Sequence, residues 1–171
     1  MADVRAALTD AGYAGVSTYV QTGNIIVTSA RPAKTVGADV EAALEAALGL
    51  DVAAAVRSDR QLTAIIAANP FVARGVDTAS LHVGYCVRKP SAAAARALAG
   101  REFGRDQFVL HGSELYLMYP DGLGRSKMTG AIFERVLEVP ITVRNWNVTT
   151  AVTALAASAQ SGRSGENAAG S

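Results

Sequence analysis

Apolar positions in the first half of the chain alternate between a helical and a strand spacing. Apolar side chains recur every three or four positions in segments that predict helices, at residues 4–11, 36–48 and 62–66. Alternating or β-branched residues predict strands at 16–20, 25–29 and 52–56. Because Gly23-Asn24 lies between the first two strands, these two are predicted to form a hairpin.

The second half repeats this order of elements after an additional strand at residues 81–87, LHVGYCV. FVLHGSELYLMY predicts a second hairpin. Further helices are predicted at 91–99, 128–137 and 148–155, and a last strand is predicted at 141–143. VAAAVRS at 52–58 parallels VPITVRN at 139–145, and YVQTGNIIV at 19–27 parallels FVLHGSELY at 108–116. The two offsets are nearly equal, at 87 and 89 residues, which indicates an internal duplication.

These patterns predict an α+β fold of two tandem ferredoxin-like halves, each with the order βαββαβ plus a helix. The halves cover residues 1–70 and 78–157, and residues 158–171 are predicted to form a disordered tail because they offer little to bury. The first half lacks the opening strand that the second half has. Unpaired backbone groups inside a sheet cost about 1–3 kcal/mol each. We therefore expect the missing strand to lie upstream of Met1, or another chain or segment to fill its place.

Composition and charge are those of an ordinary globular protein. Half of the residues are hydrophobic, and 16 basic against 15 acidic residues give a net charge of +1, unlike the strongly basic footprint of a dedicated nucleic-acid binder. Cys86 is the single cysteine, so no internal disulfide forms and a cytoplasmic location is expected. No apolar run approaches the ~20 residues that cross a bilayer, so no membrane partner is expected.

The first candidate for ligand binding is the glycine-rich loop before the helix predicted to begin at Met128. A helix start offers unpaired N–H groups, and glycines allow a ligand to approach closely, although the spacing is not that of a Walker A motif. The loop predicts a phosphate or carboxylate site; the alternative is a surface loop whose serine caps the helix. Its candidate residues are Gly122, Gly124, Arg125, Ser126 and Lys127.

Two other segments carry candidate binding residues. Arg144 ends the last strand and Trp146 is the single tryptophan, so Arg144, Asn145, Trp146 and Asn147 are candidates for holding an anion or stacking on a base. The alternative is that Arg144 lies along the sheet edge while Trp146 anchors the last helix and Asn145 caps it. The amides of Gln21 and Asn24 are candidates for lining a pocket, and the alternative is a simple hairpin turn.

No catalytic set is recognisable in the sequence. His82 and His111 lie alone on predicted strands without metal-ligand spacing, and Cys86 is expected to be a buried structural cysteine. Whether the protein is an enzyme therefore stays open, and no cofactor or metal is predicted.

Four segments, MADVRAALTDAGY, TYVQTGN, YPDGLGRSKM and TVRNWNVTT, occur in this order between residue 1 and about residue 155. In this combination the chain resembles the uncharacterised bacterial family known as domain of unknown function 1697. The resemblance implies a cytosolic protein without an established activity. It also implies an extra strand and a glycine-rich turn before the helix that starts at Met1, so we expect a start codon assigned too late or a truncated gene.

Three functions are compatible with these observations. The first is binding of a small anionic or nucleotide ligand by the loop at Gly122–Lys127. The second is a nucleic-acid or protein interaction module, and the third is an enzyme of unknown reaction. For nucleic acid, the residues available to stack on bases are Tyr19, Tyr85, Tyr116 and Tyr119. The oligomeric state is left open.

Overall fold

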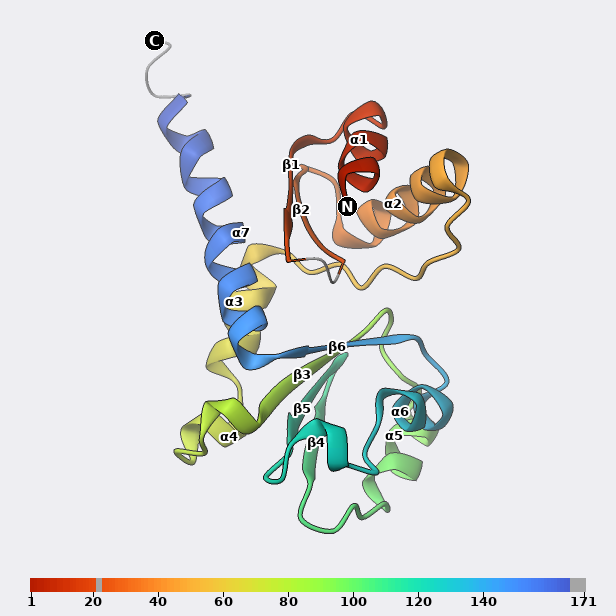
Figure 1. Cartoon of the computed structure of the whole chain (residues 1–171), viewed down its shortest axis with the longest axis vertical. Coiled ribbons are helices and arrows are strands. Elements are labelled where there is room, and N and C mark those ends of the chain that lie inside the picture. Colours follow the sequence, from red (N-terminus) through yellow and green to blue (C-terminus); the bar gives the residue numbers. More distant parts are fainter. Residues whose placement is uncertain (21–22, 167–171) are drawn as a thin grey trace. The chain divides into compact units, whose positions relative to one another are not determined.

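The computed structural model describes residues 1–20 and 23–166 (Figure 1). It contains both helices and strands, and the strands form two separate sheets. The chain divides into two compact units, residues 1–62 together with the chain from Ala151 onward, and residues 63–150. The division into halves at 1–70 and 78–157 stays a prediction. No helix in the described part is both long and apolar enough to cross a membrane.

The first unit is a hairpin packed on two helices. Helix α1 (Ala2–Asp10) leads into strands β1 (Ala14–Tyr19) and β2 (Asn24–Thr28), which pair antiparallel, and helix α2 (Ala33–Leu48) follows. Gly49 ends α2 in the left-handed conformation, with φ of 65°, which glycine adopts without steric strain. The buried core of this unit is formed by Ala7, Leu8, Tyr13, Val36, Val40 and Leu44.

The strand predicted at residues 52–56 is not formed. This segment belongs to no helix or strand, although Ala54 and Val56 pack against the core of the first unit. The N–H of Ala54 donates to Oε1 of Glu41 on α2 at 2.7 Å rather than to a neighbouring strand. The alternating pattern therefore indicated the packing of Ala54 and Val56, although Val52 is exposed. A strand also needs a backbone partner, and the described residues supply none at this place.

Helix α3 (Asp59–Ala67) begins in the first unit and ends in the second. Its start is the capping box that the sequence predicts. The N–H of Gln61 donates to Oγ of Ser58, and the N–H of Ser58 donates to Oε1 of Gln61.

The second unit contains a four-stranded antiparallel sheet with the order β4-β5-β3-β6. The strands and their connecting helices follow the order βαββαβ that the sequence predicts for this half. The elements are the short helix α4 (Pro70–Ala73), β3 (Leu81–Cys86), α5 (Ala92–Ala99), β4 (Gln107–His111), β5 (Glu114–Met118), α6 (Gly130–Leu137) and β6 (Ile141–Asn145). Short 3-10 turns lie at Thr78–Ser80 and Leu123–Arg125.

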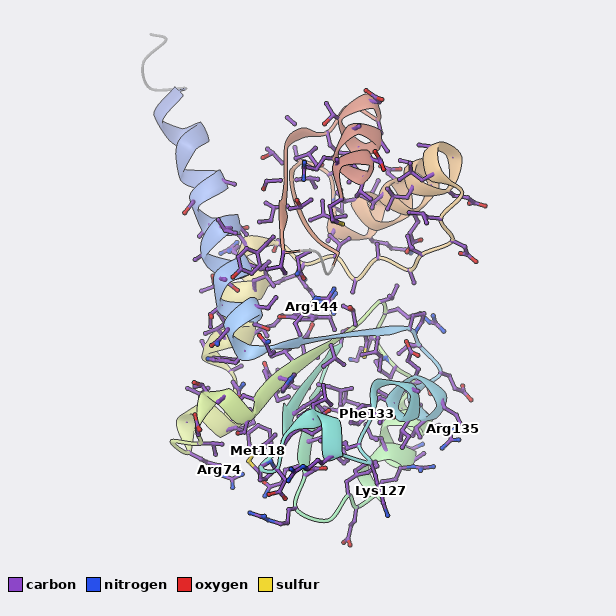
Figure 2. All side chains as sticks on the ribbon, in the orientation of Figure 1. Arg74, Met118, Lys127, Phe133, Arg135 and Arg144 are labelled. Carbon is purple, nitrogen blue, oxygen red and sulfur yellow. The ribbon has the colours of Figure 1, made fainter. Side chains whose placement is uncertain are left out.

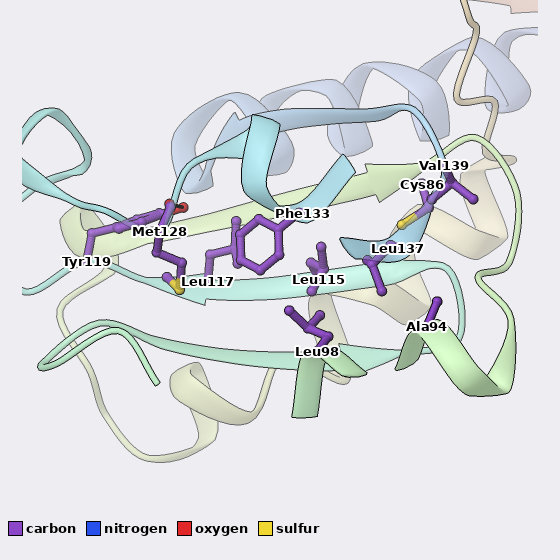
Figure 3. Packing of buried hydrophobic residues seen from close by; sticks show 10 residues of the cluster. All are labelled: Cys86, Ala94, Leu98, Leu115, Leu117, Tyr119, Met128, Phe133, Leu137 and Val139. Carbon is purple, nitrogen blue, oxygen red and sulfur yellow. Dashed lines mark hydrogen bonds between the residues drawn. The ribbon is translucent and has the colours of Figure 1, made fainter. Parts of the chain in front are cut away.

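One face of this sheet is covered by α5 and α6. Phe133 of α6 is fully buried over β5, close to Leu115 and Leu117 (Figure 3). Its ring lies 5.9 Å from that of Phe108 and 6.2 Å from that of Phe103, at angles that aromatic pairs favour. Gly84 lies beneath this layer, and a side chain there would meet Leu115 at 3.2 Å and Ile141 at 3.3 Å.

The opposite face of the sheet is also covered. Side chains alternate along β3, so Leu81, Val83 and Tyr85 point away from α5 and α6. On this face the hydroxyl of Tyr116 donates to the carbonyl of Ile65 in α3 at 3.1 Å, and the hydroxyl of Tyr85 lies 3.4 Å from that of Thr149. Strands β3 and β5 are therefore buried on both faces, while alternate residues of β4 are exposed.

Helix α7 (Trp146–Glu166) is the last element, and it belongs to both units. It ends at Glu166, beyond residue 158, where the sequence analysis placed the start of the tail.

Replacement of Phe133 by alanine tests the aromatic core of the second unit. Phe133→Ala removes a fully buried ring and leaves a cavity, so we expect the free energy of unfolding to fall by about 3–5 kcal/mol. Chemical denaturation followed by circular dichroism measures this change. Leu123→Ala is the matched control, because Leu123 is 39% exposed, and its effect should stay within about 0.5 kcal/mol. Equal effects of the two substitutions would contradict this account of the core.

Candidate functional site

The glycine-rich loop at 122–127 precedes α6 without forming its first turn. The helix begins at Gly130, not at Met128 as the sequence predicts, and Thr129 is its N-cap without a side-chain hydrogen bond. Met128 is fully buried, and its N–H donates to Oγ of Ser126 at 2.8 Å in a local turn. Apolar character placed Met128 in the helix pattern, but its side chain fills the core from the loop. The unpaired N–H groups of α6 therefore lie beyond the loop's glycines.

Two carboxylates bind side chains of this loop and its surroundings. Oγ of Ser126 donates to Oδ2 of Asp106 at 2.5 Å, and Nη1 of Arg105 contacts both oxygens of Asp121 at 2.9 and 3.0 Å. Arg125 and Lys127 are exposed. An anion at this loop would therefore approach two carboxylates together with the cations, which weakens its attraction. The anion-binding role of Gly122, Gly124, Arg125, Ser126 and Lys127 stays a prediction.

Arg144 and the loop lie on different faces of the second sheet. Arg144 pairs with Val83, and residues that pair directly lie on one face, the face opposite α5 and α6. The loop is followed directly by Met128, which is buried in the core beneath α6. The carbonyl of Met128 accepts a hydrogen bond from the hydroxyl of Tyr119. Figure 2 shows Arg144 and Lys127 far apart in the second unit. The structure therefore does not bring these two candidates into one site.

The residues around Trp146 have local structural partners. Nη1 of Arg144 donates to Oγ1 of Thr142 at 2.7 Å and to the carbonyl of Val143 at 2.9 Å. Burial lowers the pKa of Arg144, and the nearby Tyr85 opposes this shift, but a guanidinium stays charged. Oδ1 of Asn145 accepts the N–H of Val148, as a helix cap does, while Asn147 is exposed. Trp146 is only 7% exposed, so its ring has little surface for a ligand.

The first hairpin turn contributes one candidate residue to the described part of the chain. Nδ2 of Asn24 donates to the carbonyl of Tyr19 at 3.1 Å, which closes the turn. Gly23 has a φ of 75°, as such a turn requires. Gln21 lies outside the described residues.

Three of the four tyrosines proposed to stack on bases are buried, whereas Tyr19 is partly buried and its stacking role stays a prediction. Tyr85, Tyr116 and Tyr119 are 7%, 1% and 1% exposed. Burial raises the pKa of Tyr116 to about 12 and raises that of Tyr119 further, with Asp106 adding to the second shift. These rings pack within the protein, so their faces are not presented to a nucleic acid.

His82 and Cys86 lie on the core face of β3. Cys86 is fully buried, which agrees with a structural role. The ring of His82 meets that of Tyr119 edge-on at 5.1 Å, and its Nδ1 atom is buried without a hydrogen-bond partner among the described residues. Burial lowers the pKa of His82, although the Ser80 backbone opposes this shift. Within the described part of the chain, no group of three or more His, Cys, Asp or Glu residues is arranged to hold a metal ion.

The contact that sequence reasoning missed is the one between Glu41 and Ala54. Nothing in the spacing of α2 distinguishes the partly buried Glu41 from the exposed carboxylates on that helix. The available signal was the alternation at 52–56, a strand pattern for which the described residues provide no neighbouring strand.

Comparison with known proteins gives a family. A family model described as a protein of unknown function, DUF1697, matches residues 1–116. The chain belongs to the DUF1697 family. The match ends within β5, so the loop at 122–127 and the segment at 144–147 lie outside it.

A solved structure resembles this DUF1697 chain over most of its length. It is the structure of the conserved bacterial protein SP0830 from Streptococcus pneumoniae, with a TM-score of 0.67 and 18% sequence identity. The alignment covers 91% of this chain and 88% of that chain. At this level of identity the likeness supports the fold alone. No curated protein matches the sequence.

The partly buried His82 predicts a dependence of stability on pH. Its pKa is lowered in the folded state, so stability is complete above the unfolded-state pKa of about 6.5 and falls as the pH decreases below it. We expect the melting temperature to decrease between pH ~7 and ~5.5, above the range in which carboxylates titrate.

The decrease should be smaller in His82→Gln, whose side chain does not titrate. His111→Gln is the control, because His111 is exposed on β4, and it should keep the wild-type profile. Identical pH profiles for wild type and His82→Gln would show that His82 does not cause the decrease.

Ser126 provides a test of how the loop is held. Ser126→Ala removes the hydrogen bonds to Asp106 and to the N–H of Met128, so we expect a loss of about 1–3 kcal/mol in the free energy of unfolding. The control Lys127→Ala changes a neighbouring exposed residue and should be nearly neutral. A neutral Ser126→Ala would mean that these two bonds do not hold the loop.

Proposed function

We propose that the first unit is a protein interaction module that binds an extended segment of a partner polypeptide as an additional β-strand. The strand inserts between β2 and residues 52–56. One observation carries the proposal: β2 has a strand partner on one edge only, and residues 52–56 pair with no strand in the described part of the chain.

The second unit supplies the comparison that favours this position. There, β5 and β6 are joined by α6, and β3 lies between them, antiparallel to both. In the first unit, β2 and residues 52–56 are joined by α2 in the same way. We propose that the two units derive from one duplicated ferredoxin-like plan, which the matching order of elements and the two sequence matches support. In that plan, no strand of the described residues takes the position equivalent to β3 in the first unit.

The chemistry of the open position fits an extended backbone. An edge strand presents alternating N–H and C=O groups, and a peptide that adds to it forms main-chain hydrogen bonds. Each such bond contributes about 0.5–1.5 kcal/mol, so a short strand gains several kcal/mol. Ile25 and Val27 of β2 pack against the same apolar core as Ala54 and Val56. The partner strand should therefore carry apolar side chains at alternate positions.

The other functions have less support from the structure. Nucleic-acid binding by stacking lacks accessible rings at Tyr85, Tyr116 and Tyr119. Anion binding at the loop competes with Asp106 and Asp121. An enzyme would need converging reactive groups, and the described residues show no such cluster around the candidates.

A capped heptapeptide of alternating valine and threonine is a direct probe of strand addition. We expect it to slow hydrogen exchange at β2 amides and to raise the melting temperature. At a free concentration of 100 times its Kd, a ligand specific for the folded state adds about 2.7 kcal/mol to the free energy of unfolding.

The matched control is the same peptide with proline at its centre, which cannot complete a strand ladder. Equal effects of the two peptides, or protection confined to the edge strand β4 of the second unit, would refute strand addition to the first unit.

A further inference from the structure

We propose that β4 is the centre of a homodimer interface, in which the β4 strands of two copies of this chain pair antiparallel about a two-fold axis at Val109. This surface lies within the second unit and is independent of the strand-binding function proposed for the first. Strand β4 is the last strand in the sheet order β4-β5-β3-β6 (Figure 1). Among the described residues, β5 is the only strand that pairs with it.

The ladder of β5 determines which backbone groups of β4 lie at its free edge. Toward β3, the N–H of Tyr119 donates to the carbonyl of Ser80 at 2.9 Å, which assigns the odd positions of β5 and its continuation to that neighbour. Alternate residues of a strand bond to opposite neighbours, so the even positions of β5 bond to β4, where they pair with odd positions. The even positions of β4, Phe108 and Leu110, therefore direct their N–H and C=O groups to the free edge.

A groove of about 740 Å³ runs beside this edge, between β4 and α5. Its floor is apolar, because Phe103, Phe108 and Leu110 are partly buried there and pack against the core. Val109 also lines the groove although its side chain points to the other face of the sheet, so the groove reaches the backbone of the strand. A second strand can therefore bond to the edge while its alternate side chains enter the groove.

The sequence of β4 is complementary to itself in antiparallel pairing. Pairing about Val109 places Phe108 opposite Leu110 of the second copy, and Gln107 opposite its His111. The two Val109 side chains then meet at the axis, which covers a residue that is 39% exposed in the single chain. None of these pairs opposes like-charged acidic or basic residues, and β4 lacks the lysine or proline that protects many natural edges.

The charges beside the groove also suit a two-fold contact. Arg101 and Glu102 both line it and are exposed, and neither side chain has an ion pair or hydrogen bond among the residues that the structure describes. A two-fold interface brings the same surface together twice, so a surface of one sign would repel its own copy. Because opposite signs lie side by side here, the rims of the two grooves complement each other.

The test is oxidative cross-linking of Val109→Cys in the full chain. Residues directly opposed in a non-hydrogen-bonded antiparallel pair have Cα atoms about 4.5 Å apart. This distance lies within the range of about 4.4–6.8 Å that a disulfide spans. The native Cys86 is fully buried, so only the introduced thiol should react. We expect a disulfide-linked dimer on a non-reducing gel, and light scattering of the wild type should give the mass of two chains.

Two further cysteine variants control for the register. Gln107→Cys and His111→Cys should each fail to cross-link alone, because residue 107 of one copy faces residue 111 of the other. A mixture of the two variants should cross-link. Random collision, or association through the first unit, would not produce this pattern.

A charge at the axis should separate the two copies. Val109→Lys places two like charges opposite each other, so we expect the Kd of the dimer to rise about tenfold or more. Val72→Lys is the matched control, because Val72 of α4 is also 39% exposed, and this variant should remain dimeric.

Each contrary outcome has a definite meaning. A monomeric wild type would overturn the proposal. A dimer that persists in Val109→Lys, or cross-linking of Gln107→Cys alone as efficient as that of Val109→Cys, would show that the copies associate through another surface and would overturn it as well.

Discussion

Backbone pairing across neighbouring strands is the constraint on which this structure depends. In the second unit every strand has a ladder partner, and the two central strands, β5 and β3, have one on each side. Helices α5 and α6 then cover a complete surface, and the aromatic group around Phe133 packs on it. In the first unit the same kinds of element are present, but the sheet stops after two strands. Both units have a buried core, so what distinguishes them is the number of strands that pair.

The sequence predicted most of the fold because burial and spacing are recorded in it. Alternation along β3, the glycine turns of both hairpins and the Ser58–Gln61 capping box are local signals, and the structure contains each of them. The pattern at 52–56 indicated the packing of Ala54 and Val56 but predicted a strand that does not form, since pairing depends on a distant neighbour. The start of α6 was placed two residues early because Met128 is apolar, and a spacing rule does not distinguish a core residue in a loop from one in a helix.

The candidate site was harder to predict than the fold, because site chemistry depends on which side chains meet. Asn145 proved to be a cap, and Trp146 is buried, as its packing alternative requires. The hydrogen bond between Ser126 and Asp106 joins a residue before β4 to a residue after β5. No local sequence motif predicts this contact. Likewise, alternation of faces along β6 separates Arg144 from the glycine-rich loop, although the two are close in sequence.

Strand β2 has a consequence for how the protein behaves in solution. Natural edge strands discourage unwanted association by carrying lysine, proline or an inward-pointing charge. The five residues of β2, Asn24–Thr28, include none of these. An unprotected edge of this composition is a template on which identical chains can stack. High protein concentration should therefore favour aggregation through edge-to-edge pairing at β2. A single lysine substituted into this strand should reduce that aggregation.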